Sequence, residues 1–362
     1  MKLSSVGLLA ALAAPLFLNG CGVTLRTAEQ TTTDTVRYRA YGDSITYGST
    51  LADPSTEAYP SLVAKTEQVT FVNRGAPGDE ACDVPRGEIF KYADSPTLAS
   101  RPTYSLLIGT NDVDHKGTGA YEAVFLLCHQ ASISWMGLPL EDKVLATDPR
   151  VTTTGGGSLD TTDHWNSWTT AGPGSSVSFP ITTTGQGPIY AWPRIDDNNP
   201  GTYNYLLDGV MLGSGSTQTT PRISTFNHTI NSLGFLRIPA VPPGPHVVTF
   251  IQTSPAAKGL SVVGVGAPLA SSLGRRPTVL LGTVPPQRKG DTGFACGPSD
   301  APCEEYTQDI EADAALFAGD GLDVRLFDTH KYLSGTMADM SDALHPNVLG
   351  HMELSHAVES VY

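Results

Sequence analysis

A serine between two glycines, directly after a strand-like run, constrains the fold of this chain more than any other feature. The strand-like run covers residues 36–40, and residues 41–48 (YGDSITYG) follow it at once. Gly42 and Gly48 allow a sharp turn at positions where a side chain would clash. Such a turn leaves the hydroxyl of Ser44 at the carboxyl edge of a sheet, where ligands of open α/β sheets bind. Ser44 is therefore a candidate nucleophile of an α/β hydrolytic enzyme.

Three further polar segments occur in a fixed order along the chain. Residues 73–79 (NRGAPGD) follow a predicted strand at 69–72, and residues 109–112 (GTND) follow a predicted strand at 104–108. Residues 342–346 (DALHP) lie near the C-terminus, after a predicted last strand at 323–327. Four such segments in this order are hard to obtain by chance.

Together the four segments resemble those of the SGNH hydrolases, also called the GDSL esterase/lipase family. The matching positions are Ser44, Gly78, Asn111 and His345, with Asp342 as the acid of a catalytic triad. The resemblance covers about residues 36–135 and 275–362. It implies an α/β fold of the SGNH (flavodoxin-like) type, a three-layer structure around a parallel sheet. It also implies hydrolysis of carboxylic esters through an acyl-enzyme intermediate, with no cofactor and no metal.

The resemblance makes His345 the base that activates Ser44, because a serine hydroxyl is a poor nucleophile until its proton is removed. Asp342 lies three residues earlier, so on a helical turn both side chains would face the same way, and the carboxylate could orient the imidazole. Other acids and bases lie nearby in the sequence, and these alternatives are Asp328, His330, His351 and His356.

The negative oxygen formed by attack needs donors that already point at it. The resemblance implies the backbone N–H groups of Ser44 and Gly78 and the side-chain amide of Asn111. Gly75 is an alternative to Gly78. The segment departs from the family pattern at Glu80, where a threonine is often found. We expect Asp112 to brace the loop that carries Asn111, and Asp43 to support the turn before the serine.

The middle of the chain differs from the two flanking parts in its composition and in the elements that it predicts. Helix signals are absent from about 145 to 268, and short strand-like runs rich in Thr, Ser, Gly and aromatic residues take their place, with a hairpin turn at Asp208 and Gly209. We therefore expect the core at 36–140 and 271–362 to be interrupted by an inserted β-sandwich at 141–270. Residues 196–199 (DDNN) could bind calcium, but a polar hairpin tip is the simpler interpretation.

The aromatic residues of the insertion could stack on sugar rings, although large rings also dominate the cores of such domains. We expect the insertion to be a carbohydrate-binding module whose removal spares activity on small esters. The aromatic residues concerned are Trp165, Trp168, Tyr190, Trp192, Tyr203 and Tyr205.

The first twenty residues read as a signal peptide, because their apolar stretch is too short to span a membrane. Gly20 and Cys21 resemble a bacterial lipoprotein cleavage box, which would leave a lipid anchor on Cys21. The rival interpretation is an ordinary secretory signal. Residues 21–35 would then be a flexible tether to the first strand. Either way we expect an exported protein, anchored at the cell envelope or secreted.

Charge and cysteine content narrow the possible partners. The formal net charge is −14 and no basic stripe is present, which argues against nucleic acid and anionic membrane surfaces as partners.

Four of the five cysteines remain for disulfides if Cys21 carries lipid. Three pairings are then possible, and we favour Cys82–Cys128 with Cys296–Cys303, the alternative being free buried thiols.

Three functions stay open at this point. The first is an exported serine esterase that deacetylates carbohydrate. The second is a lipase or lysophospholipid acylhydrolase. The third is a catalytically silent carbohydrate-binding or adhesion module. The sequence does not decide the oligomeric state.

Overall fold

The computed structural model describes residues 35–91, 94–161, 166–223 and 231–362. Several predictions concern residues outside these ranges, namely the signal segment, the lipid anchor at Cys21, residues 21–34 of the expected tether, and Trp165 as a sugar-stacking ring. The core of the described chain is a five-stranded sheet with the strand order β17-β16-β3-β1-β2, in which every paired strand is parallel. Its strands are β1 (Tyr38–Gly42), β2 (Phe71–Gly75), β3 (Thr103–Leu107), β16 (Thr278–Gly282) and β17 (Asp323–Phe327).

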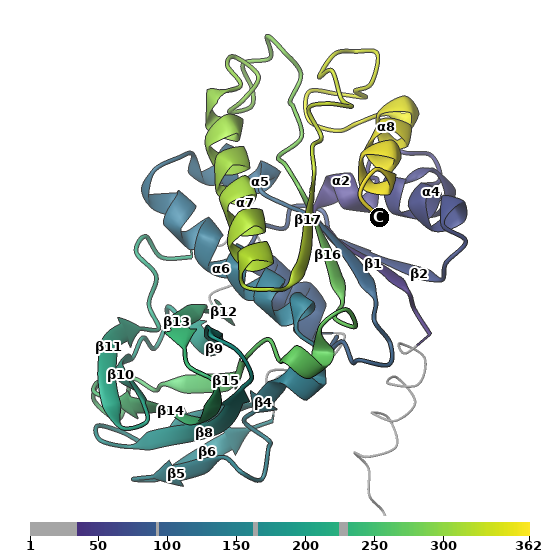
Figure 1. Cartoon of the computed structure of the whole chain (residues 1–362). Helices are drawn as coiled ribbons and strands as arrows, with labels where there is room; N and C mark the ends of the chain where they lie inside the picture. The colour runs from purple at the N-terminus through teal and green to yellow at the C-terminus, as the bar shows by residue number, and fades with distance from the viewer. Residues whose placement is uncertain (1–34, 92–93, 162–165, 224–230) are drawn as a thin grey trace, which may run out of the picture.

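Helices cover both faces of this sheet (Figure 1). Helices α4 (Tyr59–Thr66) and α8 (Val348–Glu359) pack on one face, and α6 (Ala120–Gly137) and α7 (Ala301–Gly319) pack on the other. β1 is buried along its whole length, as expected for a central parallel strand with helices on both sides. The remaining helical segments are α2 (Ser44–Tyr47), α3 (Pro54–Glu57), the π-helical η1 (Val84–Phe90), α5 (Thr110–Lys116), and the 3₁₀ turns η2 (Leu140–Asp142) and η3 (Ala270–Ser272).

Between the third and fourth parallel strands the chain forms antiparallel sheets. One has the order β11-β10-β14-β8-β5, and the other has the order β12-β9-β15-β7-β6, with β13 and β4 paired to its sides. The predicted α/β fold with an inserted antiparallel region is therefore confirmed. The strands are β4 (Lys143–Leu145), β5 (Thr152–Thr154), β6 (Gly157–Asp160), β7 (Ser167–Thr170), β8 (Ser176–Thr183), β9 (Gly187–Asp196), β10 (Thr202–Leu207), β11 (Val210–Ser216), β12 (Asn231–Leu233), β13 (Leu236–Val241), β14 (Gly244–Gln252) and β15 (Ser261–Gly266).

Local sequence signals in the insertion have mixed outcomes. Asp208 and Gly209 both have positive φ and join β10 to β11, which is the predicted hairpin. Residues 196–199 are not a hairpin tip, because they lead from β9 in one sheet to β10 in the other. There Asp196 accepts hydrogen bonds from the N–H groups of Asn198 and Asn199. Over the described ranges, no group of three or more His, Cys, Asp or Glu side chains is arranged to hold a metal ion.

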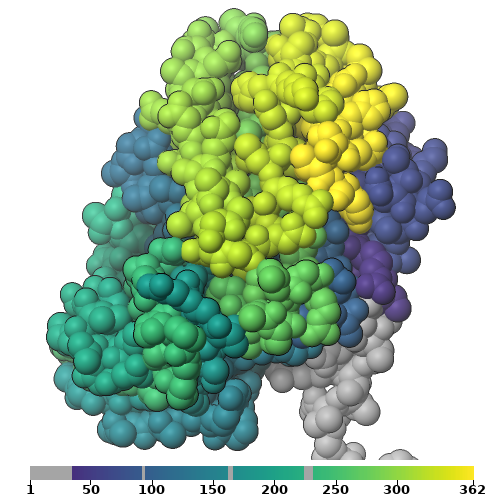
Figure 2. Space-filling model, in the orientation of Figure 1, coloured from purple at the N-terminus to yellow at the C-terminus, as the bar shows by residue number. Residues whose placement is uncertain are grey.

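The inserted sheets share a hydrophobic core with the parallel-sheet domain. Tyr190, Trp192 and Leu233 of the insertion belong to the same buried cluster as Cys128 and Trp135 of α6. The two tryptophan rings meet edge to face, with their centroids 5.0 Å apart. In Figure 2 the teal and green lobe of the insertion lies directly against the rest of the molecule.

Polar contacts reinforce this junction. Arg237 Nε of β13 donates to Asp320 at the end of α7 over 2.8 Å, and the Tyr190 hydroxyl donates to the same carboxylate over 2.8 Å. Lys143 is buried and donates from Nζ to the carbonyl of Trp135. Removal of the insertion would expose this buried surface of the core, and whether activity on small esters survives the removal stays a prediction.

Of the five proposed sugar-stacking rings that the structure describes, three are core residues. Tyr190, Trp192 and Tyr203 are buried, whereas Trp168 and Tyr205 are partly exposed. Tyr190 and Trp192 therefore join the insertion to the α/β core, and among the described rings Trp168 and Tyr205 are the two that face solvent in part.

Both favoured disulfides are present. Cys82 is bonded to Cys128, which ties the segment after Gly78 to α6, and Cys296 is bonded to Cys303 at the start of α7. Within the described residues, no helix combines the length and the apolar character needed to cross a lipid bilayer.

Candidate active site

Ser44 lies at the carboxyl edge of the parallel sheet, as the first residue of α2. Asp43 caps this short helix by accepting the N–H of Ile45 over 2.8 Å. Gly42 has a φ of 153°, and a Cβ placed there would lie 2.1 Å from the carbonyl oxygen of Leu107. The close packing of β1 against β3 therefore requires glycine directly before the Asp-Ser turn.

A chain of two hydrogen bonds links Ser44, His345 and Asp342. Ser44 Oγ lies 3.0 Å from His345 Nε2, and His345 Nδ1 lies 2.9 Å from Asp342 Oδ2. Ser44 and His345 are 301 positions apart in the chain. The fold thus brings together the three residues that the sequence predicts as nucleophile, base and acid.

The chemistry of these groups fixes the direction of both hydrogen bonds. An ionised carboxylate only accepts hydrogen bonds, so His345 Nδ1 carries the proton and donates to Asp342. In the neutral imidazole, Nε2 is then the nitrogen with the lone pair, and it accepts a hydrogen bond from the hydroxyl group of Ser44. Burial raises the pKa of Asp342, but the N–H groups of His345 and Leu344 and the His345 ring outweigh it and hold that pKa below its ordinary value. The carboxylate therefore stays ionised at neutral pH.

The segment that carries Asp342 and His345 is not the expected helical turn. It is a bend in which Asp342 Oδ1 accepts the N–H groups of Leu344 and His345, over 2.8 and 2.7 Å. The reason is Pro346, because a proline disfavours the helical conformation of the residue before it. The aspartate thus organises its own loop and holds the imidazole ring with the same carboxylate.

The alternative acids and bases lie elsewhere. Asp328 accepts the N–H of His330, whose Nε2 lies 2.8 Å from the carbonyl oxygen of Val284. His351 is buried against Tyr59, and burial lowers its pKa to about 4. His356 is exposed on α8. None of these pairs with Ser44 in the described chain.

Two backbone N–H groups and one side-chain amide are the predicted oxyanion donors. Ser44 is the first helical residue of α2, so its N–H has no acceptor within the helix. Gly78 has a φ of 87°, which favours glycine, and its N–H donates to no acceptor among the described residues. Asn111 Nδ2 donates to the carbonyl of Asp79 over 2.8 Å, which fixes the amide and leaves its second hydrogen for a ligand.

Gly75, the alternative donor, is already engaged. Its N–H donates to Asn73 Oδ1 over 2.9 Å. A Cβ at Gly75 would lie 2.3 Å from the backbone nitrogen of Tyr47, so this glycine allows β2 to pack against α2. The geometry therefore favours Gly78 as the second backbone donor.

Several buried carboxyl groups lie in or against residues 78–82, and the sequence analysis did not predict that they would be buried together. Asp112 accepts the N–H of Ala81 with both carboxylate oxygens, so it braces this segment rather than its own loop. Glu80 contacts His115 and Lys116, over 3.1 and 3.2 Å. Asp79 is buried, and its Oδ2 accepts no hydrogen bond from the described residues. The acidic residues that follow Gly78 in the sequence were the signal from which this cluster could have been predicted.

Comparisons with known proteins give only distant likenesses. No family model matches the chain, and no curated protein matches it. A two-domain esterase active on acetylated mannans is 15% identical, with 67% of this chain and 94% of that chain covered and a TM-score of 0.34. A lipolytic G-D-S-L family protein from Veillonella parvula is 11% identical, with coverage of 90% and 97% and a TM-score of 0.41.

An acetylxylan esterase from Geobacillus stearothermophilus is 13% identical, with 90% of this chain and 93% of that chain covered and a TM-score of 0.38. These values are too low to assign a family or a substrate. The functional argument therefore rests on the geometry of the site.

Proposed function

We propose that this chain is a serine esterase of the SGNH type, which hydrolyses carboxylic esters through an acyl-enzyme intermediate. The observation that carries the proposal is the hydrogen-bonded series from Ser44 through His345 to Asp342. A nucleophile, a base within reach of its proton and a third group that orients the base are the parts that acyl transfer requires.

Each residue has a defined task in the two half-reactions. Ser44 Oγ attacks the ester carbonyl carbon while its proton passes to His345 Nε2, and Asp342 stabilises the resulting imidazolium. The proton then goes to the leaving alcohol, and the acyl group remains on Ser44. In the second half, His345 takes a proton from water, whose oxygen attacks the acyl carbon, and the carboxylic acid leaves as Ser44 regains its proton.

The tetrahedral intermediates carry a negative oxygen in both half-reactions. The N–H groups of Ser44 and Gly78 and the free hydrogen of the Asn111 amide are the donors for this oxygen. Because the Asp79 carbonyl holds the amide before substrate arrives, the donor does not have to reorganise during the reaction.

Carbohydrate acetate esters are the substrate class that we propose first. His345 and Asp342 are partly exposed at the surface, which suits access by an ester on a bulky polymer. The activities named for two of the aligned esterases make acetylated mannan and acetylxylan the first polymers to test.

A second candidate, a lipid acylhydrolase, is favoured by one observation. Exposed apolar side chains follow the two catalytic segments directly, with Tyr47 after Ser44 and a group at the start of α8 after His345. Exposed apolar side chains next to the catalytic segments could contact an acyl chain. The residues at the start of α8 are Val348, Leu349 and Met352.

Acyl-chain preference separates the two candidates. Hydrolysis of p-nitrophenyl esters from acetate to long acyl chains should be measured for the wild-type protein and for Ser44→Ala. The proposal predicts serine-dependent cleavage confined to the shortest esters. A preference for long chains would favour the lipid acylhydrolase, and the absence of any serine-dependent cleavage would favour the silent binding module.

Export of this chain is also a proposal. The two disulfides suit an oxidising compartment, and the first 21 residues supply the predicted signal and lipid attachment site. Expression of the full chain and of Cys21→Ser, followed by separation of membrane and soluble fractions, tests the anchor. Lipoprotein processing predicts that the variant loses the lipid mass and leaves the membrane fraction.

A further inference from the structure

The inserted region reaches the segment that supplies the Gly78 N–H. Ser232, in β12, is fully buried, and its hydroxyl donates to the backbone carbonyl of Cys82 over 2.7 Å. Cys82 lies four residues after Gly78 and is itself buried. The two residues that form this hydrogen bond are 150 positions apart in the chain.

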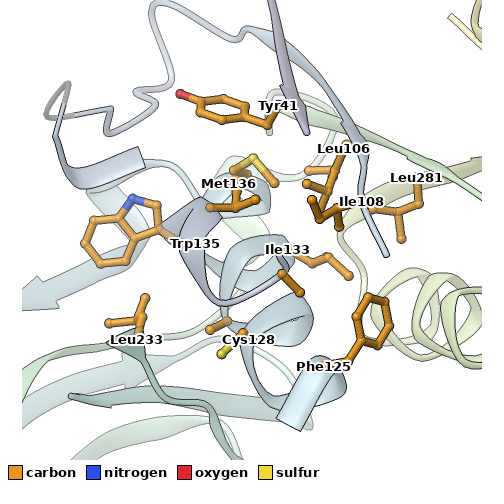
Figure 3. Packing of buried hydrophobic residues seen from close by; sticks show 14 of the residues in the cluster. Tyr41, Leu106, Ile108, Phe125, Cys128, Ile133, Trp135, Met136, Leu233 and Leu281 are labelled. Carbon is orange, nitrogen blue, oxygen red and sulfur yellow. The ribbon is translucent and has the colours of Figure 1, made fainter. Parts of the chain in front are cut away.

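Packing around this hydrogen bond fixes both partners. Cys128, the disulfide partner of Cys82, has its sulfur 3.7 Å from the Ser232 hydroxyl. Leu233, the next residue of β12, belongs to the buried cluster that includes Cys128 and Trp135 of α6, and Figure 3 shows these three side chains in one region. β12 is held on its other side by pairing with β9.

Other restraints on residues 78–82 come from the α/β core. Asn111 donates to the carbonyl of Asp79, Asp112 accepts the N–H of Ala81, and the disulfide fixes Cys82 to α6. Ser232 adds a restraint from the insertion at the far end of the same short segment. A segment held at several points along its length presents its N–H groups in one orientation, which an oxyanion site requires.

We propose that Ser232 is a positioning residue for the oxyanion site, so that the inserted region supports catalysis as well as any substrate binding. This inference rests on the proposed esterase function, in which the Gly78 N–H stabilises the negative oxygen. Ser232 acts through the backbone of residues 78–82 and does not touch the reacting atoms.

The test compares Ser232→Ala with the matched control Ser254→Ala in the full chain. Ser254 is also a buried serine of the insertion, and it donates to a backbone carbonyl, that of Lys258, over 2.8 Å. Ser232→Ala loses this one buried hydrogen bond to Cys82, whereas Ser254→Ala loses its bond to Lys258 and the one that its hydroxyl accepts from Gln252 Nε2 over 3.3 Å, and both of these lie within the insertion. Measurements are made at a temperature at which circular dichroism shows both variants to be folded.

Two readouts are needed. Hydrogen exchange of the amides at positions 79–83 should become faster by about tenfold or more in Ser232→Ala and stay unchanged in the control. For a short-chain ester, kcat should fall by about ten- to a hundredfold with KM changed by less than about twofold. Ser232→Thr retains the hydroxyl and should return both readouts toward those of the wild type.

The outcomes separate this inference from the function on which it rests. Unchanged exchange at positions 79–83 in Ser232→Ala would overturn the inference, whether or not any ester is hydrolysed. Faster exchange with a kcat equal to that of the control would also overturn it, because the segment would then loosen without consequence. If the wild-type protein hydrolyses no ester, the proposed function fails, and the exchange comparison alone decides whether Ser232 holds the segment.

Discussion

Asp79 is a buried acid beside a candidate oxyanion donor, and its titration predicts how stability changes with pH. Burial first, and the neighbouring carboxylates second, raise the pKa of Asp79 from 3.8 to about 8. Between these two values the folded protein keeps the proton and the unfolded chain releases it. The unfolded state then binds fewer protons, so the free energy of unfolding falls as pH rises from about 4 to about 8.

The size of this loss in the free energy of unfolding follows from the width of the pH interval. From pH 5 to pH 8, one proton over three pH units at about 1.4 kcal/mol per unit gives an upper bound of about 4 kcal/mol. Local opening of the segment lets water reach the carboxylate and reduces this penalty, so we expect about 3 kcal/mol from Asp79. Asn has nearly the same shape as Asp but does not titrate, so Asp79→Asn should remove this contribution.

Urea unfolding of the wild type and of Asp79→Asn at pH 5 and pH 8 measures the effect. As the pH rises from 5 to 8, the free energy of unfolding of Asp79→Asn should rise by about 3 kcal/mol relative to that of the wild type. Glu311→Gln is the control for loss of one negative charge, because Glu311 is exposed on α7. Parallel pH dependence in the wild type and Asp79→Asn would refute the reasoning.

Other buried groups also make the free energy of unfolding depend on pH, in the wild type and in the variant. Burial raises the pKa values of Asp43 and Glu88 to about 7, so both add to the loss of stability at rising pH. Burial lowers the pKa of His351 to about 4, so its contribution has the opposite sign between pH 4 and pH 6.5. Asp43 and Glu88 interact electrostatically with Asp79, so the difference between the wild type and Asp79→Asn reports the titration of Asp79 together with these interactions.

Three further predictions follow from the site and the shared core. Asn111→Ala should lower kcat/KM for a short ester by about 100- to 1000-fold, and a loss under threefold would remove Asn111 from the oxyanion site. His345→Ala should lower kcat by roughly a thousandfold or more, whereas His330→Ala should leave it within threefold; equal losses would contradict the assignment of the base. Leu233→Ala should lower the free energy of unfolding by about 2–5 kcal/mol and lower the temperature of a single calorimetric transition. Two transitions, one of them at the wild-type temperature, would show that the insertion unfolds by itself.

The sequence predicted the elements that follow local rules. The last strand was expected at 323–327 and is observed as Asp323–Phe327. The resemblance supplied the catalytic segments, and the position of Ser44 directly after a strand agreed with a ligand site at the carboxyl edge of a parallel sheet. The resemblance also paired Ser44 with His345, although the two residues are 301 positions apart in the chain.

The features that the sequence did not predict depend on tertiary contacts. Ser232 lies in a segment rich in serine and threonine, and nothing nearby in the sequence marks it as the partner of Cys82. Tyr190 and Trp192 resemble the exposed rings of a sugar-binding face, yet the packing of the insertion against α6 and α7 buries them. The bend at Asp342, in contrast, could have been foreseen, because Pro346 disfavours a helical His345.

The central claim is that Ser44 is a nucleophile activated by His345. The most direct test is mass spectrometry of the intact protein after reaction with a fluorophosphonate, an electrophile that forms a stable adduct with activated serines. The claim predicts one adduct per chain, located on Ser44, absent from Ser44→Ala and formed far more slowly in His345→Ala. Labelling of a different residue, or equal labelling of the wild type and Ser44→Ala, would contradict it.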